Sequence, residues 1–368
     1  MAHVKKHKEL EKYIENVYNF KSEFKSICSQ YYDDDTIVEQ PSILPSAERI
    51  IVLGDVHGDW NKLISALKLG KVIDEDYNWN GGTTIVVQVG DQIDRCRYVK
   101  GGPTCDKKEA TLNDEPHDWK ILQYFTRLHK QAIKKGGAVY SLLGNHELMN
   151  VQGDMRYVSY QGFKEFENYK KPDGTIIKDG EEARRWAFEP GNHISEFLAC
   201  TRQVALIIGT NLFVHAGIIP KLAKKYNVTN INQIMSLYLL DKLKTKSKYG
   251  DLFNQSKETP LWTRALGNIG LKHFSNQINS TEESKNKEKQ ICDANIKVVK
   301  EVYGIDNIII GHTPLLTNGI GSICDGAVWM TDYGQSDAFK PFKNEHIVQV
   351  LEILQKENQP KTIRVLKE

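Results

Sequence analysis

The sequence lacks long apolar runs and a strong charge of either sign. Its apolar stretches, such as residues 204–208, are far too short to span a bilayer. The formal net charge is only +2, so the chain has neither the basic field of a nucleic-acid-binding protein nor a surface suited to strongly acidic partners. We therefore expect no membrane segment and no nucleic-acid partner.

The sequence also lacks a Cys-x-x-Cys pair and the apolar core of a signal peptide. Its six cysteines are scattered along the chain, which is typical of reduced thiols in a cytosolic protein. Pairing of Cys96 with Cys105 across their loop is the less favoured alternative. The first eight residues, Met-Ala-His-Val-Lys-Lys-His-Lys, are too polar for the start of a secretory signal. The expected location is cytoplasmic.

A short apolar run that ends abruptly in charge is the most informative feature of the chain. Residues 49–53 (Arg-Ile-Ile-Val-Leu) read as a buried strand and lead into residues 54–59 (Gly-Asp-Val-His-Gly-Asp). Asp55 and His57 lie two positions apart, so both project to the same side of an extended chain. A carboxylate beside an imidazole at the end of a strand suits a divalent metal ion.

The same change from strand to polar loop occurs four more times. Ligands of open α/β sheets bind beyond the carboxyl ends of the strands, where a glycine permits a tight turn. Each motif alone is typical of an ordinary turn, but five in one chain indicate a shared site. The residues that the five strand ends would pool are Asp55, His57, Asp91, Asn145, His215 and His312.

The ordered motifs resemble those of the calcineurin-like metallophosphoesterases. The set is Gly-Asp-x-His-Gly, Gly-Asp-x-x-Asp-Arg, Gly-Asn-His-Glu, His-x-Gly and Gly-His-Thr-Pro, and the resemblance covers about residues 48–345. Residues 142–149, 188–191 and 324–329 place the chain near the phosphoprotein phosphatases, closest to the Shewanella-like and other bacterial-type branches. The resemblance implies an α/β fold in which a two-sheet β-sandwich is flanked by helices.

The resemblance also implies a centre of two divalent metal ions, with Mn, Fe or Zn as the candidates. One ion would take Asp55, His57 and Asp91. The other would share Asp91 and add Asn145, His215 and His312. Such a pair would hold a bridging hydroxide that attacks the phosphorus of a phosphate monoester in line, without a covalent phosphoenzyme.

Further roles follow from the same resemblance. His146 would be the general acid that protonates the leaving oxygen, and Asp94 would fix the orientation of its ring. Arg95 and Asn145 would bind the phosphate, since a guanidinium matches phosphate geometry with paired donors. Arg264, in the Pro-Leu-Trp-Thr-Arg stretch that resembles the Trp-x-Arg of the bacterial-type branch, would be the second phosphate-binding arginine.

Two positions depart from the family pattern without removing a metal ligand. Cys96 replaces the glycine that commonly follows Asp-Arg, and Ala216 stands where the eukaryotic enzymes have a glycine. Cys96 is interpreted first as a small packing residue. The alternative is a thiol made oxidation-sensitive by the neighbouring Arg95.

Length and composition fit one large α/β domain with insertions, because 40% of the 368 residues are hydrophobic. We divide the chain into a helical N-terminal extension (1–47), a catalytic domain (48–345) and a C-terminal hairpin (346–368) that completes it. A small, mainly helical cap is expected at about residues 151–200 within the catalytic domain.

Two of these regions have open interpretations. The N-terminal extension has apolar residues at helical spacing, which favours packing on the catalytic domain; the alternative is a docking arm for a partner or membrane. In the cap, Arg184 and Arg185 are expected at the solvated surface, with contact to phosphorylated substrate as the alternative.

The expected function is a protein phosphatase, acting on phosphotyrosine at least as readily as on phosphoserine or phosphothreonine. A phosphoprotein would then be its main partner. Hydrolysis of dinucleoside polyphosphates or another small phosphoester is an alternative, since related bacterial-type enzymes share these motifs. A phosphate-sensing or scaffold pseudophosphatase is the non-enzymatic alternative, against which the complete set of ligands and His146 weigh.

Overall fold

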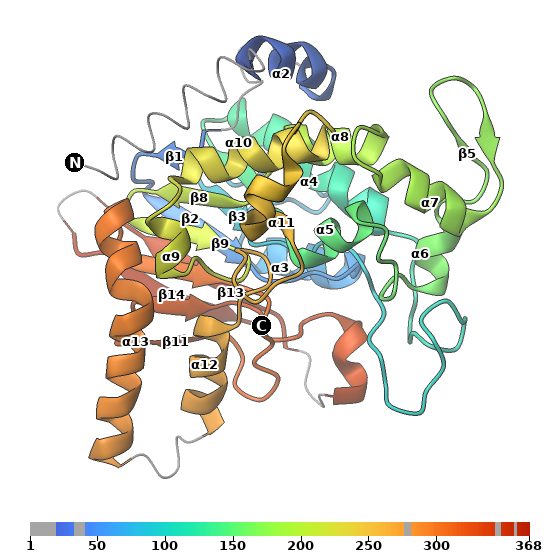
Figure 1. Ribbon diagram of the computed structural model, residues 1–368. Helices are drawn as coiled ribbons and strands as arrows, with labels where there is room; N and C mark the ends of the chain where they lie inside the picture. Colours follow the sequence, from blue (N-terminus) through green and yellow to red (C-terminus); the bar gives the residue numbers. More distant parts are fainter. Residues whose placement is uncertain (1–19, 33–40, 276–280, 343–346, 357–358) are drawn as a thin grey trace.

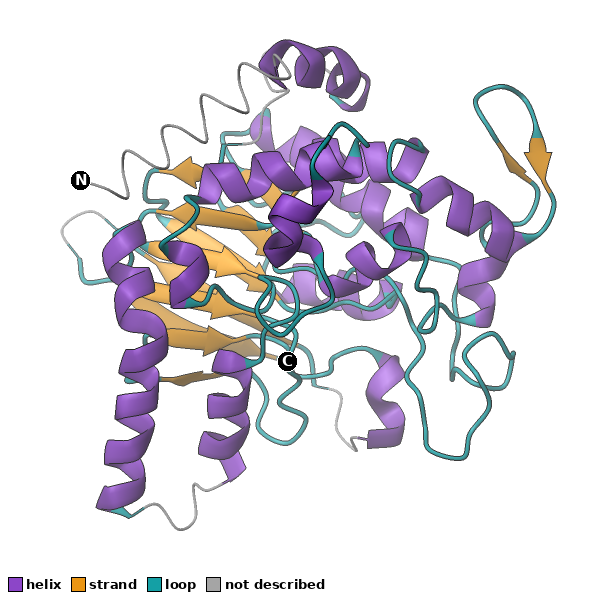
Figure 2. Ribbon diagram, viewed as in Figure 1, coloured by secondary structure: helices purple, strands orange, loops and turns teal. Residues whose placement is uncertain are grey.

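The computed structural model describes residues 20–32, 41–275, 281–342, 347–356 and 359–368. Two six-stranded sheets pack face to face, and helices cover their outer faces (Figures 1 and 2). This arrangement confirms the predicted α/β fold class. None of the helices that the structure describes is both long enough and apolar enough to cross a bilayer.

Both sheets are mixed: parallel pairs such as β9–β10 and β2–β3 form their centres, and each sheet has one parallel and one antiparallel edge pair. The first sheet, in spatial order, consists of β1 (Ile43–Leu44), β8 (Ala205–Ile208), β9 (Asn211–Val214), β10 (Asn307–Ile310), β12 (Val328–Met330) and β11 (Gly321–Ile323). The second consists of β14 (Thr362–Lys367), β13 (Gln349–Leu354), β2 (Arg49–Leu53), β3 (Ile85–Gln88), β4 (Ala138–Leu142) and β7 (Arg202–Gln203). The antiparallel pair β13–β14 is a C-terminal hairpin, and β13 joins it to β2.

The apolar runs of the strands are continuous because both faces of each sheet are covered. Side chains alternate along a strand, so Ile50 and Val52 of β2 enter the layer between the sheets. Ile51 and Leu53 face the helices outside. Phe213 of β9 enters the same inner layer from the other sheet. Burial of each such side chain stabilises the fold by about 1.5–3 kcal/mol.

Helices lie outside both sheets. The second sheet is covered by α3 (Trp60–Leu69) and α4 (Asp118–Ile133). The remaining larger helices are α8 (His193–Thr201), α10 (Val228–Leu239), α12 (Ala265–Ser275) and α13 (Glu282–Tyr303). Shorter helical segments are α5 (Asn145–Val151), α9 (Pro220–Ala223), α11 (Gly250–Phe253), η1 (Ser29–Tyr31), η3 (Lys246–Tyr249) and η4 (Asp337–Phe342). In Figure 1, α12 and α13 run side by side as a pair.

The region of the expected cap is mainly helical. It contains α6 (Tyr160–Lys164), α7 (Gly180–Phe188) and α8, with a hairpin of β5 (Tyr169–Lys170) and β6 (Ile176–Ile177) between α6 and α7. The hairpin projects at the edge of the molecule in Figure 1. The α7 helix packs on α5, which brings this region against the end of β4.

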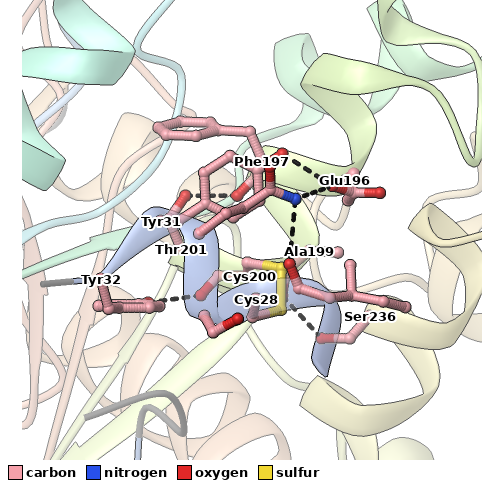
Figure 3. Close-up of a disulfide and its surroundings, with 12 residues drawn as sticks. Cys28, Tyr31, Tyr32, Glu196, Phe197, Ala199, Cys200, Thr201 and Ser236 are labelled. Carbon is pink, nitrogen blue, oxygen red and sulfur yellow. Dashed lines mark hydrogen bonds between the residues drawn. A yellow bond between two sulfur atoms is a disulfide. The ribbon is translucent and has the colours of Figure 1, made fainter. Parts of the chain in front are cut away.

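The N-terminal helix α2 (Phe20–Cys28) packs on α8. Phe24, Cys28 and Tyr32 are buried in this contact. The Tyr32 hydroxyl donates to the carbonyl of Cys200 at 2.5 Å (Figure 3). The region from α2 to Tyr32 therefore packs on the rest of the fold. Residues 1–19 and 33–40 of the predicted extension, with its docking alternative, lie outside the described residues. Its last part is not helical, because β1 pairs with β8 of the first sheet.

All six cysteines form disulfides, so the prediction of reduced thiols is wrong. The pairs are Cys28–Cys200, Cys96–Cys105 and Cys292–Cys324, which are 172, 9 and 32 residues apart. The less favoured pairing across the Cys96 loop is the one that the structure contains. Packing of α2 on α8 brings Cys28 to Cys200 (Figure 3), and spacing along the chain carries no sign of such a long-range contact.

Candidate metal centre

Five strand ends from both sheets converge on one buried site. The second sheet supplies Asp55 and His57 after β2, Asp91 after β3 and Asn145 after β4. The first sheet supplies the remaining two ligands, from β9 and β10. Each of the six predicted ligands is at most 6% exposed; they are Asp55, His57, Asp91, Asn145, His215 and His312.

Asp91 lies at the centre of this group and turns its two oxygens to different partners. Its Oδ2 is 3.8 Å from Nε2 of His57 and 3.8 Å from Nε2 of His146. Its Oδ1 is 3.3 Å from Nε2 of His215. One carboxylate thus faces two clusters of donor atoms, as a ligand shared between two cations would.

The second cluster contains an amide oxygen between two imidazoles. Oδ1 of Asn145 is 2.9 Å from Nε2 of His215 and 2.8 Å from Nδ1 of His312. The buried Nε2 of His312 has no hydrogen-bond partner among the described residues. A buried nitrogen without a partner calls for an explanation, and a bound cation would supply one. Imidazole nitrogens beside carboxylate and amide oxygens, with no thiolate, fit divalent Mn, Fe or Zn. Three donors of this cluster, on Asp91, His215 and His312, lie within 4.8 Å of one another.

Backbone carbonyls fix the orientation of two of the imidazoles. The carbonyl of Ile93 lies 3.2 Å from Nδ1 of His57, and the carbonyl of Val89 lies 2.9 Å from Nδ1 of His215. Each contact leaves Nε2 directed toward Asp91. Hydrogen bonds from the far nitrogen are the usual way in which proteins orient a metal-binding histidine.

Glu147 holds two of the motif loops together. Its buried carboxylate accepts hydrogen bonds from the backbone N–H of Asp91, Gln92 and Gly144 at 2.7–3.0 Å. A Cβ on Gly144 would lie 2.1 Å from Oδ1 of Asp91, so only glycine permits this approach. The sequence analysis assigned no role to Glu147.

Four site residues have a left-handed backbone. The φ angles are 47° at His57, 53° at Asp91, 71° at Asp94 and 66° at His312. Each such position costs about 1–3 kcal/mol unless the surroundings compensate it. Strained non-glycine residues gathered at one place are typical of a functional site.

Electrostatics favour an ionised Asp91 and neutral imidazoles at His57 and His312. At His215 burial opposes protonation, but the charge of Asp91 and its hydrogen bond outweigh burial and raise the pKa. Burial, reinforced by the positive charge of Arg97, holds the pKa of His57 well below its usual value. Burial and the neighbouring His215 do the same to the pKa of His312. Burial opposes ionisation of Asp91, but the facing imidazoles outweigh it and hold its pKa well below the usual range. At His57, His312 and Asp91 these are the protonation states that metal ligands need.

His146 lies beside the metal ligands and is held from behind by Asp94. Nδ1 of His146 donates to Oδ2 of Asp94 at 2.9 Å, while Nε2 faces Asp91. Nη2 of Arg184 donates to Oδ1 of Asp94 at 3.1 Å, and its Nε donates to Asn150 at 2.8 Å. Arg184 is 0% exposed, so its predicted place at the solvated surface is wrong. Arg185, by contrast, is exposed and pairs with Glu181.

The two arginines predicted to bind phosphate lie in different settings. Nη1 of Arg264 donates to the carbonyl of His312 at 3.2 Å and to Oγ1 of Thr313 at 3.1 Å, which places it at the rim of the site. Arg95 is 2% exposed, and carboxylate oxygens of Asp59 and Glu115 lie 3.4 and 3.2 Å from its guanidinium. The phosphate-binding roles of both arginines stay predictions.

Asp332 is a buried acid of the site that the sequence analysis missed. It follows β12, and its charge helps raise the pKa of Asp55. Burial is the main reason that its own pKa is raised to about 6. The signal for it was available, because residues 328–332 repeat the pattern of an apolar strand followed by an acid.

Comparison with known proteins agrees with this geometry. Residues 48–315 match the family model of the calcineurin-like phosphoesterases. An uncharacterized protein of Acanthamoeba polyphaga mimivirus is 38% identical over 250 residues, covering 62% of this chain and 94% of that protein. Shewanella-like protein phosphatase 2 of Arabidopsis thaliana is 27% identical over 321 residues, covering 78% of this chain and 72% of its own.

Solved structures show the same fold. The cold-active protein-tyrosine phosphatase of a psychrophilic Shewanella species superposes with a TM-score of 0.60 at 20% identity, covering 91% of this chain and 85% of that one. A further relative by sequence, Shewanella-like protein phosphatase 1 of Plasmodium berghei, is 27% identical over 291 residues, covering 78% of this chain and 67% of its own. The chain belongs to the calcineurin-like phosphoesterase family and is a metal-dependent phosphatase.

Proposed function

We propose that the enzyme is a protein phosphatase that uses two divalent metal ions held by the six strand-end ligands. The observation that carries the proposal is the position of Asp91, whose two oxygens face two separate clusters of donor atoms. When bound, two such ions lower the pKa of water and stabilise charge on the phosphoryl oxygens. Mn, Fe and Zn all match the donor set.

Residues of the chain would supply the remaining steps of an in-line hydrolysis. Arg264 lies at the rim, where its guanidinium can orient the phosphoryl group. Nε2 of His146 would hold the proton that passes to the leaving oxygen, since Nδ1 is engaged by Asp94. Arg184 fixes Asp94 in turn and so sets the direction of the imidazole.

A groove beside the site supports a polypeptide substrate. It has a volume of about 570 Å³ and lies between the Cys96–Cys105 loop and the cap. Tyr98, Met155 and Tyr157 contribute to its wall, and the Tyr157 ring lies 5.0 Å from the ring of His146. The residues that flank a phosphorylated side chain would occupy this groove. Its aromatic wall supports phosphotyrosine at least as well as phosphoserine or phosphothreonine.

The compartment in which the enzyme acts is a separate part of the proposal. The expected cytoplasmic location depended on reduced thiols and on the polar N-terminus, and the three disulfides remove the first of these supports. We propose an oxidising environment instead, because disulfides persist there. Alkylation of the native chain before and after reduction tests this: protection of all six cysteines in the first sample supports it, and labelling of all six contradicts it.

Substrate comparison tests the activity. Metal-loaded enzyme is assayed side by side with phosphotyrosyl peptide, phosphoseryl peptide and diadenosine tetraphosphate. Faster turnover of a phosphopeptide supports the proposal, and preference for the nucleotide would replace it with a small-molecule phosphoesterase. A wild-type chain with two bound ions per molecule and no turnover of any of the three would indicate a pseudophosphatase.

A further inference from the structure

We propose that Arg97 binds the phosphoryl group of the substrate, a role that the resemblance assigned to Arg95. The inference rests on the proposed function, because it requires a substrate that carries phosphate. Four observations carry it: the position of the guanidinium, its lack of a carboxylate partner, the engagement of Arg95 elsewhere, and the disulfide that fixes the loop.

Two aromatic rings place Arg97 at the catalytic site. Its Cζ lies 4.8 Å from the ring centroid of Phe339 and 5.7 Å from that of Tyr157. The Phe339 ring is 5.7 Å from the ring of His57, and the Tyr157 ring is 5.0 Å from the ring of His146. The guanidinium therefore lies close to the two rings that adjoin a metal ligand and the expected general acid.

Arg97 forms no ion pair with a carboxylate among the described residues. Its Nη1 donates to the backbone carbonyls of Asp94 at 3.1 Å and Cys96 at 2.7 Å. Within the described ranges, no carboxylate lies at ion-pair distance from its side chain. Asp91, Asp94 and Asp332 act on it electrostatically without forming an ion pair. A largely buried cation without a counter-ion is costly, and a phosphate dianion bound at this site would supply the missing partner.

Arg95 is in the opposite situation. Its guanidinium lies within 3.4 Å of Asp59 and 3.2 Å of Glu115, and its Nη1 donates to the carbonyl of Gly58 at 3.0 Å. Only Nε of Arg95, which is buried, has no hydrogen-bond partner among the described residues. To bind a phosphate through Nη1 or Nη2, Arg95 would have to leave the two carboxylates that neutralise its charge. Its contacts join the loop after β2 to the loop before α4, which is a structural role.

The Cys96–Cys105 disulfide fixes the backbone next to Arg97. Cys96 is the residue immediately before Arg97, and its backbone N–H donates to the carbonyl of Tyr157 at 3.2 Å. The loop is thus held covalently at one position and by a hydrogen bond to the cap. A guanidinium already held beside aromatic rings loses little freedom when an oxyanion binds to its remaining N–H groups.

Substitution of Arg97 tests the inference with inorganic phosphate as the probe. Arg97→Ala and Arg97→Lys are compared with wild type and with Arg127→Ala, which removes one arginine from the exposed face of α4. Each protein is loaded with Mn²⁺, its metal content is measured, and phosphate affinity is determined by calorimetry. We expect Arg97→Ala to bind phosphate at least 10-fold more weakly with unchanged metal content, Arg97→Lys to recover part of the loss, and Arg127→Ala to match wild type.

The two failures can be told apart. If Arg97→Ala binds phosphate as wild type does while Arg95→Ala loses binding, Arg95 has the role and the inference is wrong. If metal-loaded wild type itself neither binds phosphate nor hydrolyses p-nitrophenyl phosphate, the proposed function is wrong. Should Arg97→Ala fail to fold, Arg97→Gln gives the same comparison, because it keeps most of the side chain and removes the charge.

Discussion

Nη2 of Arg184 donates to Oδ1 of Asp94 at 3.1 Å, and this contact joins the cap to the catalytic site. The arginine belongs to α7, and the aspartate follows β3, 90 residues earlier. The other oxygen of Asp94 accepts the hydrogen bond from His146. The cap therefore supports Asp94, and through it His146, from inside the fold, in addition to bordering the groove.

Arg184→Lys should lower kcat by about 10–100-fold with little change in KM. This range is typical for loss of a residue that orients the groups of a metal site through hydrogen bonds. A lysine cannot contact Asp94 and Asn150 together, so the His146 ring would lose its fixed direction. The loss should be larger for alkyl phosphates, whose leaving oxygen needs a proton, than for p-nitrophenyl phosphate. Arg202→Lys, which changes another buried arginine without touching Asp94, is the control. Equal losses on both substrates would contradict the positioning role.

Asp91→Asn should remove both metal ions, whereas Asp55→Asn should remove one. The difference follows from the two oxygens of Asp91 that face two clusters. Metal content per chain, measured by mass spectrometry of the purified proteins, distinguishes the two variants. Turnover should fall to background in Asp91→Asn. Retention of one full equivalent of metal in that variant would argue against a shared ligand.

Replacing both cysteines of the Cys96–Cys105 pair by serine should weaken phosphate binding, though less than Arg97→Ala does. The loop that carries Arg97 would keep its hydrogen bond to Tyr157 and lose its covalent closure. Closure of a loop this short contributes about 2–3 kcal/mol to the free energy of unfolding. The matched control replaces Cys292 and Cys324 by serine. Equal phosphate affinity in the two double variants would show that loop closure does not position Arg97.

Cys28→Ser should lower the free energy of unfolding by up to about 5 kcal/mol, because the disulfide closes a very long loop. Loss of the bond also weakens the contact of α2 with α8 shown in Figure 3. Urea unfolding without reductant measures the difference from wild type. The same experiment in a strong reductant should abolish the difference, since both chains then lack the bond. A difference that persists would arise from packing of the Cys28 side chain.

His129 should make the protein less stable as the pH falls from 6.5 to 4. Burial lowers the pKa of its imidazole in the folded chain from 6.5 to about 4, so the unfolded chain binds the proton first. The free energy of unfolding should therefore fall by roughly 3 kcal/mol between pH 6.5 and pH 4 because of this residue. His129→Gln should flatten the dependence of unfolding free energy on pH over the same range. An unchanged slope would place the titration on other residues.

The gathering of the candidate metal ligands at one site could be predicted because their signal is local. Each lies in the loop that follows an apolar strand, and the parallel strands place Asp55, Asp91 and Asn145 at one edge of a sheet. The αββα arrangement followed from the family resemblance of the same motifs. Asp332 escaped notice because a threonine precedes it, whereas a glycine directly precedes Asp55, Asp91, Asn145 and His312.

The remaining features depend on contacts between distant elements. Cys28 reaches Cys200 only when α2 packs on α8. Arg184 enters the interior because Asp94 and Asp118 compensate its charge there, and a sequence shows no such partners. The orientation of Arg97 likewise depends on two rings more than 50 positions away in the chain.

The division of the metal ligands between the two sheets has a mechanical consequence. Asp55, His57, Asp91 and Asn145 come from one sheet, whereas His215 and His312 come from the other. Ions bound by this set would act as a cross-link between the halves of the sandwich. Removal of the ions by a chelator should then speed amide hydrogen exchange at the carboxyl ends of β9 and β10, including at residues whose side chains do not belong to the site. The alignment of the sheets and the occupancy of the metal centre would in this way be coupled.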